Sequence, residues 1–434
     1  MADNFPKPVN AESNQAEAIV ADNATSGKPD TAPQGLRYIP QERVDSRTDE
    51  EIIEYLQKKH PVTSEKNVWY FWNTGWKSMK PWVQRGVIAS VRRMGSEWTV
   101  HFTDLVPGSE THVYNYIDAE KYLPAVFREG RMDSEKAGQF QGDLVRLPLL
   151  LEYGGVWLDA GMILLRHLDD ICWKKIEDPN SPYELAGFLL AGYENNDLTM
   201  ANGFFATRAQ NPFLQRVYQV YRTLWEDGAT NQDGFHLHPL LRHMGTLHTP
   251  NKDIPVSFPD MGPITDYLSQ TFCIERIRHL IDPNDGFNGP EYWATKIFGI
   301  AMPQEMWRHQ LTTLWNGKRQ WELFSKKRSG PDCVQDADWY EAETLVHEIL
   351  SNSSVLKLST GSPGTEEWWL ATYWNKKEYE QADIEEGTFA AYLRWGSCHF
   401  DQIRELAPLK LELETERVWR AGVLEPVKVD EVGK

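Results

Sequence analysis

Cysteine is scarce in this sequence, which has four cysteines among 434 residues. A disulfide framework or a thiolate metal site needs cysteines at short, paired spacings. These four stand far apart, at Cys172, Cys273, Cys333 and Cys398. We therefore interpret them as reduced, mostly structural thiols. The length is sufficient for one large domain or two closely joined ones with a sizeable core.

Basic residues are also in deficit: 45 Lys and Arg stand against 63 Asp and Glu, which gives a net charge of -18. Binding to nucleic acid or to an anionic membrane surface needs clustered Lys and Arg. The charge therefore argues against both partners. A diphosphate-bearing ligand would have to be held locally, by a metal ion or by one basic side chain.

Long apolar runs are missing as well. The first residues contain no apolar core flanked by basic residues, and no run is long enough to cross a bilayer. We therefore expect a cytoplasmic protein without a signal peptide or membrane anchor. Residues 1–35 are rich in Ala, Asn, Ser, Pro and Gly, which predicts a disordered leader.

The rest of the chain alternates between strand and helix patterns, which predicts an α/β fold with a mostly parallel sheet. Such sheets bind ligands beyond the carboxyl ends of their strands, here around residues 73–75. Pro148 is expected to kink its helix, and after residue 230 the pattern predicts loops and short helices around a site. The predicted strands are 68–72, 98–102, 156–158, 185–190 and 203–206, and the predicted helices are 49–59, 81–94, 139–153 and 212–225.

The densest chemical signal lies between residues 143 and 159. Asp143 and Arg146 are three apart, so they are neighbours on one helical face. Gly154 and Gly155 end the helix and allow a close backbone approach. A short apolar strand then delivers the carboxylate of Asp159 to the sheet edge. Taken singly, the first pair is typical of a surface ion pair and the glycines of a helix stop; together they indicate a donor-binding site.

This block resembles the retaining glycosyltransferases that include the yeast-type α-1,6-mannosyltransferases, and most closely their capsular-polysaccharide-synthesis subgroup in bacteria and fungi. Weaker similarities at 68–72, 200–212, 261–263 (a Gly-Pro turn) and 355–358 extend it to about residues 65–360. The resemblance implies a GT-A-like fold, with a single Rossmann-type, mostly parallel sheet, flanking helices and a helical, loop-rich C-terminal acceptor region. We expect the catalytic domain at 36–360 and a C-terminal extension packed on it at 361–434.

The same resemblance implies transfer of a sugar, with retention, from a UDP- or GDP-sugar to a hydroxyl acceptor. In such enzymes the first Asp of the motif binds the nucleoside, and an acidic Asp-X-Asp element holds a divalent metal on the diphosphate. The expected catalytic residues are Asp159 and Lys357, with Asp159 as the metal ligand; the expected donor-binding residues are Trp72, Asn73, Asp143, Arg146, Gly154, Gly155, Trp157 and Asn202. No Asp or Glu stands out as a nucleophile or base, which fits a front-face reaction in which the leaving phosphate takes the acceptor proton.

The sequence departs from the family pattern at Gly161, where a second carboxylate is expected. A Mn²⁺ or Mg²⁺ ion at Asp159 would need a further ligand, for which His347, His399 and the loop 359–365 are candidates. Lys357 could instead neutralise the leaving diphosphate. A metal-independent enzyme, a catalytically impaired sugar-nucleotide-binding subunit and a nucleotide-sugar hydrolase are the alternatives.

Aromatic residues are plentiful, at 12% with 18 Trp, and they bear on the acceptor. Most aromatic rings are expected to fill the core, including the cluster at Trp368, Trp369 and Trp374, whose alternative role is a lid. Apolar ligand pockets are nevertheless rich in such rings. A small apolar metabolite is therefore slightly favoured as acceptor over a glycan precursor or a protein, because the C-terminal half supplies Trp293, Trp307, Trp315, Trp321 and Tyr373.

Overall fold

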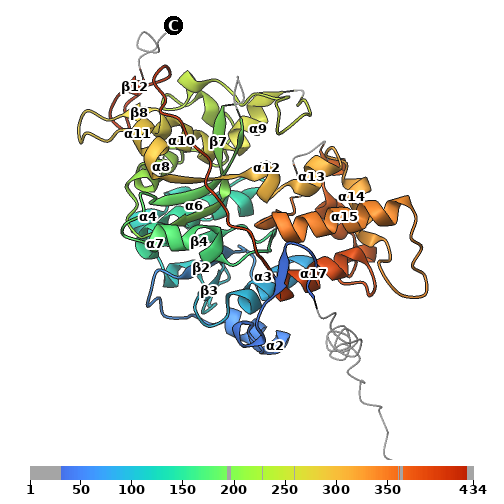
Figure 1. Cartoon of the computed structure of the whole chain (residues 1–434). Helices are drawn as coiled ribbons and strands as arrows, with labels where there is room; N and C mark the ends of the chain where they lie inside the picture. The colour runs from blue at the N-terminus through green and yellow to red at the C-terminus, as the bar shows by residue number, and fades with distance from the viewer. Residues whose placement is uncertain are drawn as a thin grey trace, which may run out of the picture.

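A six-stranded sheet runs through the centre of the protein, in the order β3-β2-β4-β7-β6-β9 (Figure 1). The structure is a computed structural model that describes residues 31–192, 197–226, 228–258, 260–359, 361 and 365–427, so most of the predicted leader lies outside the described residues. The strands of this sheet are β2 (Asn67–Phe71), β3 (Thr99–Thr103), β4 (Gly155–Leu158), β6 (Leu185–Ala191), β7 (Leu198–Thr207) and β9 (Ile297–Ala301). All five predicted strands are present.

The sheet is mainly but not wholly parallel. β2 runs parallel to β3 and to β4, and β6 runs parallel to β9. β7 is antiparallel to both of its neighbours, β4 and β6. The mixed α/β class with a mainly parallel sheet is thus confirmed. The reversed β7 has a consequence for the site, since it carries its middle residues past the carboxyl end of β4.

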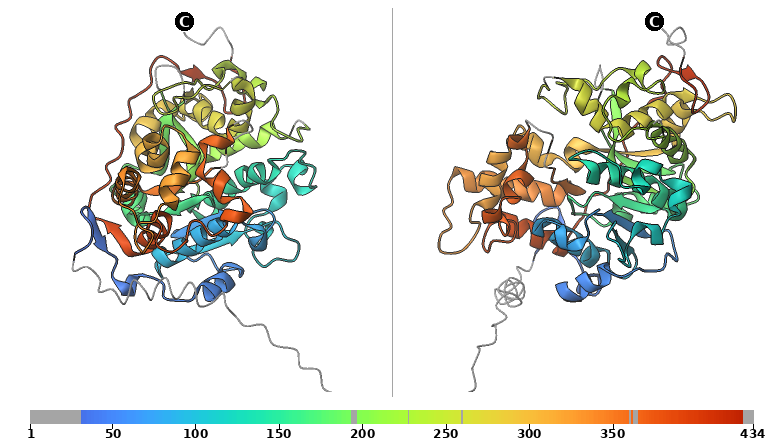
Figure 2. Two further views of the ribbon diagram at one scale, coloured as in Figure 1. Left: turned by 90° about the vertical axis from the view of Figure 1, so that its right-hand side faces the viewer. Right: turned by 180° about the vertical axis from the view of Figure 1, so that it is seen from behind.

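Two hydrophobic cores fill the two faces of the sheet. Side chains alternate between faces along a strand: in β2, Val68 and Tyr70 join one core, whereas Trp69 and Phe71 join the other. The first core packs against α3 and a C-terminal group of helices, and the second packs against α6, α8 and α10. Figure 2 shows the C-terminal helices gathered beside the sheet, away from α8 and α10.

The helices agree closely with the predicted ones up to residue 225 and are more regular than predicted after it. α6 runs unbroken through Pro148. Their bounds are α2 (Asp49–Leu56), α3 (Pro81–Met94), α4 (Ala119–Tyr122), α5 (Ala125–Arg128), α6 (Ala137–Tyr153), α7 (Lys174–Glu177), α8 (Pro212–Leu224), α9 (Met261–Tyr267), α10 (Ser269–Arg278), α11 (Gly289–Lys296), α12 (Met302–Glu305), α13 (Arg308–Thr312), α14 (Gly317–Ser325), α15 (Ala337–Asn352), α16 (Leu370–Trp374) and α17 (Phe389–His399). The described part of the chain contains no helix that is both long and apolar enough to span a membrane.

Three two-stranded pairings tie distant segments together. β10 (Val355–Lys357) pairs with β5 (Met162–Leu164), which directly follows the predicted site segment. β1 (Leu36–Tyr38) pairs with β11 (Phe400–Gln402), and β8 (Leu280–Ile281) pairs with β12 (Trp419–Arg420). Residues 261–263, compared above with a Gly-Pro turn, instead begin α9. Asp260 caps this helix by accepting a hydrogen bond from Gly262 N.

The turn from α6 into β4 depends on the two glycines. Gly154 and Gly155 have φ angles of +64° and +101°, a region that favours glycine. A Cβ at Gly155 would lie 2.4 Å from the carbonyl oxygen of Asn67, so β4 approaches β2 as closely as backbone allows. The close approach that the sequence predicted therefore exists, and its partner is the neighbouring strand.

We expect Gly155→Ala to lower the free energy of unfolding much more than Gly130→Ala does. Gly130 also has a positive φ, +63°, but no atom lies within 4 Å of its would-be Cβ. The control should thus cost about 1 kcal/mol from backbone strain alone, and Gly155→Ala about 3 kcal/mol because strand contact is added. Urea denaturation of both variants measures the difference. Equal losses would show that the contact with Asn67 contributes nothing.

Candidate functional site

Polar side chains from five elements meet at the carboxyl end of β4. Asp143 and Arg146 come from α6, and Asp159 directly follows β4. The three others are Asn202 of β7, Gln270 of α10 and Lys357 at the end of β10. Asp159 N donates to the carbonyl oxygen of Gly203 at 3.0 Å, which fixes the end of β4 against the reversed strand β7.

Arg146 is the centre of this cluster. Its side chain is only 5% exposed, and its Nη2 lies 2.8 Å from Asp143 Oδ1 and 3.3 Å from Asp159 Oδ1. Its Nη1 donates to the carbonyl oxygen of Asn202 and, at 3.2 Å, to Gln270 Oε1. The guanidinium carbon also lies 5.0 Å from the centre of the Trp157 ring. One cation thus holds two carboxylates and two strands in a fixed arrangement.

A second set of bonds joins Asp143 to the neighbouring amides. Asn202 Nδ2 donates to Asp143 Oδ1 at 3.1 Å and to Gln270 Oε1 at 3.3 Å. Gln270 Nε2 in turn donates to the backbone carbonyl of Asp143 at 2.7 Å. Buried polar groups that are fully paired hold a single geometry. Gln270 was not predicted from the sequence, because a single Gln in a helix of mixed polar and apolar residues forms no motif.

Asp159 is the most accessible carboxylate of the cluster, with 28% of its side chain exposed. Its Oδ1 accepts from Trp157 Nε1 at 3.0 Å, in addition to Arg146, and its Oδ2 accepts from Lys357 Nζ at 3.0 Å. A Cβ on Gly203 would lie 2.6 Å from both Asp159 Oδ2 and Lys357 Nζ. Glycine at 203 therefore leaves the space that this ion pair fills, a role that the sequence did not reveal.

Lys357 reaches Asp159 because β10 pairs with β5, just beyond the site segment. Leu358 N donates to the carbonyl oxygen of Gly161 at 2.8 Å. A Cβ at Gly161 would lie 2.6 Å from the carbonyl oxygen of Leu358. The position where the family pattern has a second carboxylate is thus occupied by the backbone of the C-terminal strand that brings Lys357.

The two carboxylates of the cluster differ in acidity. Burial raises the pKa of Asp143 to about 6, although Arg146 beside it acts in the opposite direction. Burial would also raise the pKa of Asp159, but Lys357 and Arg146 together hold that pKa below its ordinary value. Asp159, between two cations, is therefore the more acidic of the two carboxyls, whereas Asp143 takes up a proton in mildly acidic solution.

The remaining predicted donor-site residues lie around this cluster. Trp72 and Asn73 follow β2 at the same sheet edge, where Asn73 Nδ2 donates to Gln141 of α6 at 2.9 Å and Trp72 Nε1 donates to Ser78 at 3.1 Å. Gly154 and Gly155 stand at the opposite end of β4, roughly 13 Å from Asp159 at the usual rise of a strand. The structure therefore places the two glycines apart from the other predicted residues.

Two of the side chains suggested as further metal ligands, His399 and Thr365, have other partners. His399 stacks on Trp395 with the ring centres 4.4 Å apart, and its Nδ1 lies 2.7 Å from the carbonyl oxygen of Trp395. His347 lies on α15. Of the loop 359–365, only residues 359, 361 and 365 are described, and Thr365 accepts a hydrogen bond from Trp369 Nε1 at 3.1 Å.

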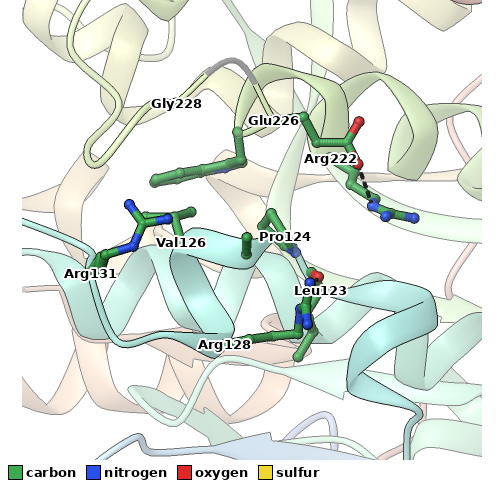
Figure 3. A pocket seen from close by; sticks show the side chains of 10 residues that line it. Leu123, Pro124, Val126, Arg128, Arg131, Arg222, Glu226 and Gly228 are labelled. Carbon is green, nitrogen blue, oxygen red and sulfur yellow. Dashed lines mark hydrogen bonds and ion pairs between the residues drawn. The ribbon is translucent and has the colours of Figure 1, made fainter.

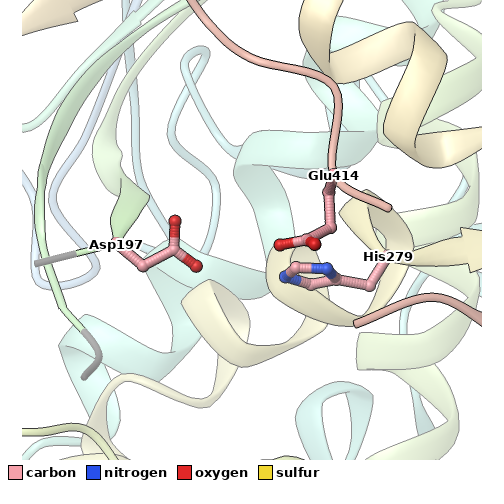
Figure 4. A group of neighbouring side chains, drawn as sticks. All are labelled: Asp197, His279 and Glu414. Carbon is pink, nitrogen blue, oxygen red and sulfur yellow. The ribbon is translucent and has the colours of Figure 1, made fainter. Parts of the chain in front are cut away.

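One group of described residues could hold a metal ion by its composition: Asp197, His279 and Glu414 (Figure 4). Its carboxylates are already engaged. Asp197 pairs with Arg417 and, at 3.0 Å, with Arg278, and Glu414 accepts the backbone N–H groups of residues 416 and 417. An ion would have to displace two arginines, so the group is better explained as an ion-pair cluster that fastens the C-terminal segment to α10.

A cavity of about 210 Å³ lies elsewhere, between α5 and the end of α8 (Figure 3). Arg128, Arg131 and Arg222 line it, together with Trp225. Each of these arginines has a carboxylate partner: Glu120, Glu129 and Glu226 respectively. None of the predicted site residues lines this cavity.

Comparison with known proteins shows the family of this chain. A family model described as capsular polysaccharide synthesis protein matches residues 30–261, more than half of the chain. The chain belongs to this family. Three curated fungal relatives match nearly the whole chain. The O-glycosyltransferase braB of Annulohypoxylon truncatum is 50% identical, over 91% of this chain and 94% of its own.

The glycosyltransferase afumC of Aspergillus fumigatus is 43% identical, over 90% of this chain and 100% of its own. The O-glycosyltransferase PaGT of Phomopsis amygdali is 35% identical, over 91% of this chain and 97% of its own. The protein is therefore a glycosyltransferase, an enzyme that moves a sugar from a donor to an acceptor. This confirms the enzyme class predicted from the block around Asp143 and Asp159.

The raised pKa of Asp143 predicts how the stability of this glycosyltransferase changes with pH. Below about pH 3 the carboxyl is protonated in the folded and unfolded states alike. As the pH rises towards and through 6, the folded state keeps a proton that the unfolded state has lost, and stability falls. The gap between 3.8 and about 6 corresponds to about 3 kcal/mol.

The side chain of Asp143→Asn cannot ionise. We therefore expect the free energy of unfolding of this variant to rise by about 3 kcal/mol relative to that of the wild type between about pH 4 and about pH 7. Urea denaturation across this range measures the difference. Asp170→Asn is the matched control. Lys174 lowers the pKa of Asp170 despite its burial, so the free energy of unfolding of the wild type should rise relative to that of this variant as the pH rises. A difference that does not change with pH would contradict the assignment for Asp143.

Proposed function

We propose that this glycosyltransferase uses a nucleotide diphosphate sugar, UDP- or GDP-linked, and transfers the sugar to a hydroxyl group with retention. The observation that carries the proposal is the cluster of Asp143, Arg146, Asp159 and Lys357 at the carboxyl edge of the sheet. Ligands of open α/β sheets bind at this edge. The printed names of two relatives, both O-glycosyltransferases, support an oxygen acceptor.

The charge distribution supports a diphosphate donor. In a chain with a net charge of -18, Arg146 and Lys357 place two cations beside the one accessible carboxylate of the cluster. Charge-assisted hydrogen bonds from Lys and Arg are the usual means of holding phosphate. We assign Asp143, together with Trp72 and Asn73 at the end of β2, to the nucleoside, and Asn202 and Trp157 to the sugar-phosphate region.

The residues present do not fit a divalent metal at Asp159. Both oxygens of this carboxylate accept hydrogen bonds from cationic or indole N–H donors. Position 161 cannot carry a side chain without moving Leu358, because even a Cβ would lie 2.6 Å from its carbonyl oxygen. We therefore propose that the Lys357 ammonium, and not Mn²⁺ or Mg²⁺, faces the diphosphate.

The chemistry then rests on stabilising the leaving group. As the bond between the anomeric carbon and the phosphate oxygen breaks, negative charge grows on the diphosphate. Preorganised cations at this place lower the barrier because they are in position before the charge develops. Asp159 holds Lys357 in place, which makes it a positioning residue in this scheme. Retention rests on the family resemblance.

A small apolar acceptor is supported by the aromatic residues next to Lys357. The carbonyl oxygen of Met306 accepts a hydrogen bond from Lys357 N at 3.3 Å, and Trp307 follows directly. The Trp307 ring centre lies 5.1 Å from that of Trp315 and 6.4 Å from that of Trp369. The indole N–H groups of Trp307 and Trp315 are buried without a partner among the described residues. Trp307 and Trp315 are 8% and 3% exposed and pack in one core, and Trp293, 2% exposed, packs in the other.

Two further assignments complete the proposal. We place the catalytic domain at residues 36–360 and treat 361–434 as an extension packed on it through α17 and β11. We also place the enzyme in the cytoplasm.

Asp159→Ala should abolish transfer while leaving the fold intact, because it removes the anchor of both cations. The assay offers UDP- and GDP-sugars with a panel of hydroxyl acceptors that includes naphthol and its fully saturated counterpart. Product analysis with and without acceptor separates transfer from hydrolysis. The thermal shifts with UDP and GDP show whether the donor carries uracil or guanine. Asp170→Ala removes a half-buried carboxylate that is paired with Lys174 outside the cluster, and it is the control. Near-normal turnover by Asp159→Ala would refute the site.

The metal-free donor site makes a separate prediction. Exhaustive chelation with EDTA should leave kcat within about twofold, whereas Lys357→Met should lower kcat by about 100-fold or more, as loss of one transition-state cation does. Lys174→Met removes an equivalent lysine from the exposed Asp170 pair and should have no effect. Activity that disappears on chelation and returns with Mn²⁺ would instead favour a metal at Asp159.

A further inference from the structure

A lysine and a tyrosine form a close pair at the start of α6, beside the donor cluster. The Nζ atom of Lys136 lies 4.0 Å from the centre of the Tyr267 ring. Lys136 is the residue before α6, and Tyr267 is the last residue of α9. Both residues are half-buried. An ammonium group at this distance from an aromatic ring makes a cation–π contact, so the ring holds the head group of the lysine in place.

This pair stands on the face of α6 that carries Asp143. Lys136, Phe140 and Asp143 are four and three residues apart, a spacing that places them along one helical face. Tyr267 also packs on Phe140, with the ring centres 6.3 Å apart. Gln270, three residues after Tyr267, donates to the backbone carbonyl of Asp143. The segment that contains Tyr267 therefore follows this face from Lys136 to Asp143.

The charges of the donor cluster act on Tyr267. Burial and the negative charges of Asp143 and Asp159 raise the pKa of Tyr267, whereas Arg146 acts in the opposite direction. The ring thus lies close enough to the donor cluster to be influenced by both of its carboxylates. Burial also lowers the pKa of Lys136. Since a half-buried ammonium group has lost part of its water shell, an acceptor oxygen that reaches it is bound more strongly than in water.

Lys136 and Lys357 lie at opposite ends of the site. Lys357 pairs with Asp159, and Arg146 joins Asp159 to Asp143 from one turn further along α6. Lys136 precedes Asp143 by seven residues, about 10 Å along the helix axis at the usual rise. The proposed position of the diphosphate and Lys136 are therefore on opposite sides of Asp143. A nucleoside held at Asp143 extends over a comparable length, so its base reaches the region of Lys136.

The other residues assigned to the nucleoside gather at the same end of α6. A Cβ at Gly138, two residues after Lys136, would lie 3.0 Å from Asn73 Oδ1. Asn73 also donates to Gln141, in the next turn of the helix. Trp72 directly precedes Asn73 in the chain. The first two turns of α6 therefore lie against the strand end where the nucleoside is expected.

We propose that Lys136 recognises the base of the donor nucleotide by donating a hydrogen bond to a carbonyl oxygen of that base, and that Tyr267 is its positioning residue. This inference rests on the proposed function, which supplies the nucleotide and places its nucleoside at Asp143. An ammonium group has three donors and no acceptor. It binds the carbonyl oxygen by which uracil differs from cytosine and guanine from adenine, and it opposes the amino group that cytosine and adenine carry instead.

The test measures the affinity of the full-length enzyme for UDP, CDP, GDP and ADP by titration calorimetry. All four nucleotides carry the same diphosphate, so differences between them come from the base. We expect the wild type to prefer UDP over CDP, or GDP over ADP, by at least about tenfold, as a hydrogen bond to a charged group provides. Lys136→Met should remove most of this preference, because it weakens only the binding of the nucleotide with the carbonyl oxygen. Lys136→Arg keeps a cation with donors alone and should retain part of the preference.

Two variants test the role of Tyr267. Tyr267→Leu removes the aromatic ring and should lower the preference, whereas Tyr267→Phe keeps the ring and should retain it. A loss of stability alone would not change the ratio of two affinities in this way. Lys121→Met is the matched control, since Lys121 lies 4.4 Å from the centre of the Tyr122 ring and pairs with Glu152 outside the donor cluster. It should bind all four nucleotides as the wild type does.

Three results would overturn the role of Lys136 while leaving the proposed function in place. They are equal binding of both members of each pair by the wild type, an unchanged preference in Lys136→Met, and an equal loss of affinity for all four nucleotides in that variant. The last result would make Lys136 a contact of the diphosphate. Failure of the wild type to bind any nucleoside diphosphate would overturn the proposed function as well.

Discussion

The carboxylate of Asp159, held between Lys357 and Arg146, is the interaction on which the site depends. A partly buried carboxylate needs compensation by cations or N–H donors, and here the compensation comes from 13 residues away on one side and 198 on the other. β10 must therefore pair with β5, and α6 must end at Gly154 so that β4 can begin. The reversed strand β7 contributes Gly203, whose missing side chain gives the ion pair its room.

The same arrangement explains the glycine that departs from the family pattern. A second carboxylate at position 161 conflicts with the strand that delivers Lys357, because its Cβ would lie only 2.6 Å from the carbonyl oxygen of Leu358. The ammonium group of Lys357 can neutralise part of the charge that a divalent ion would neutralise, and it needs no coordination shell. Its charge density is lower than that of a divalent ion, but Arg146 adds a second cation beside the same carboxylate.

The helices and strands around the site could be predicted from the sequence because their patterns are local. Continuous apolar runs marked β2 and β4, helical spacing marked α3 and α6, and the glycine pair marked the end of α6. The direction of β7 could not be predicted, since an antiparallel strand buried on both faces has the same apolar run as a parallel one. The roles of Gln270 and Gly203 depend on contacts between distant segments, for which one sequence contains no periodic signal.

The charges around Asp159 also limit the chemical role of this carboxylate. Near Asp159 the cations favour anions, so a base placed there would be a poor proton acceptor; the lowered pKa of Asp159 shows this directly. In the proposed reaction Asp159 therefore holds the cations and takes no proton. A front-face reaction needs no protein base, because the leaving phosphate itself can take the proton of the acceptor hydroxyl.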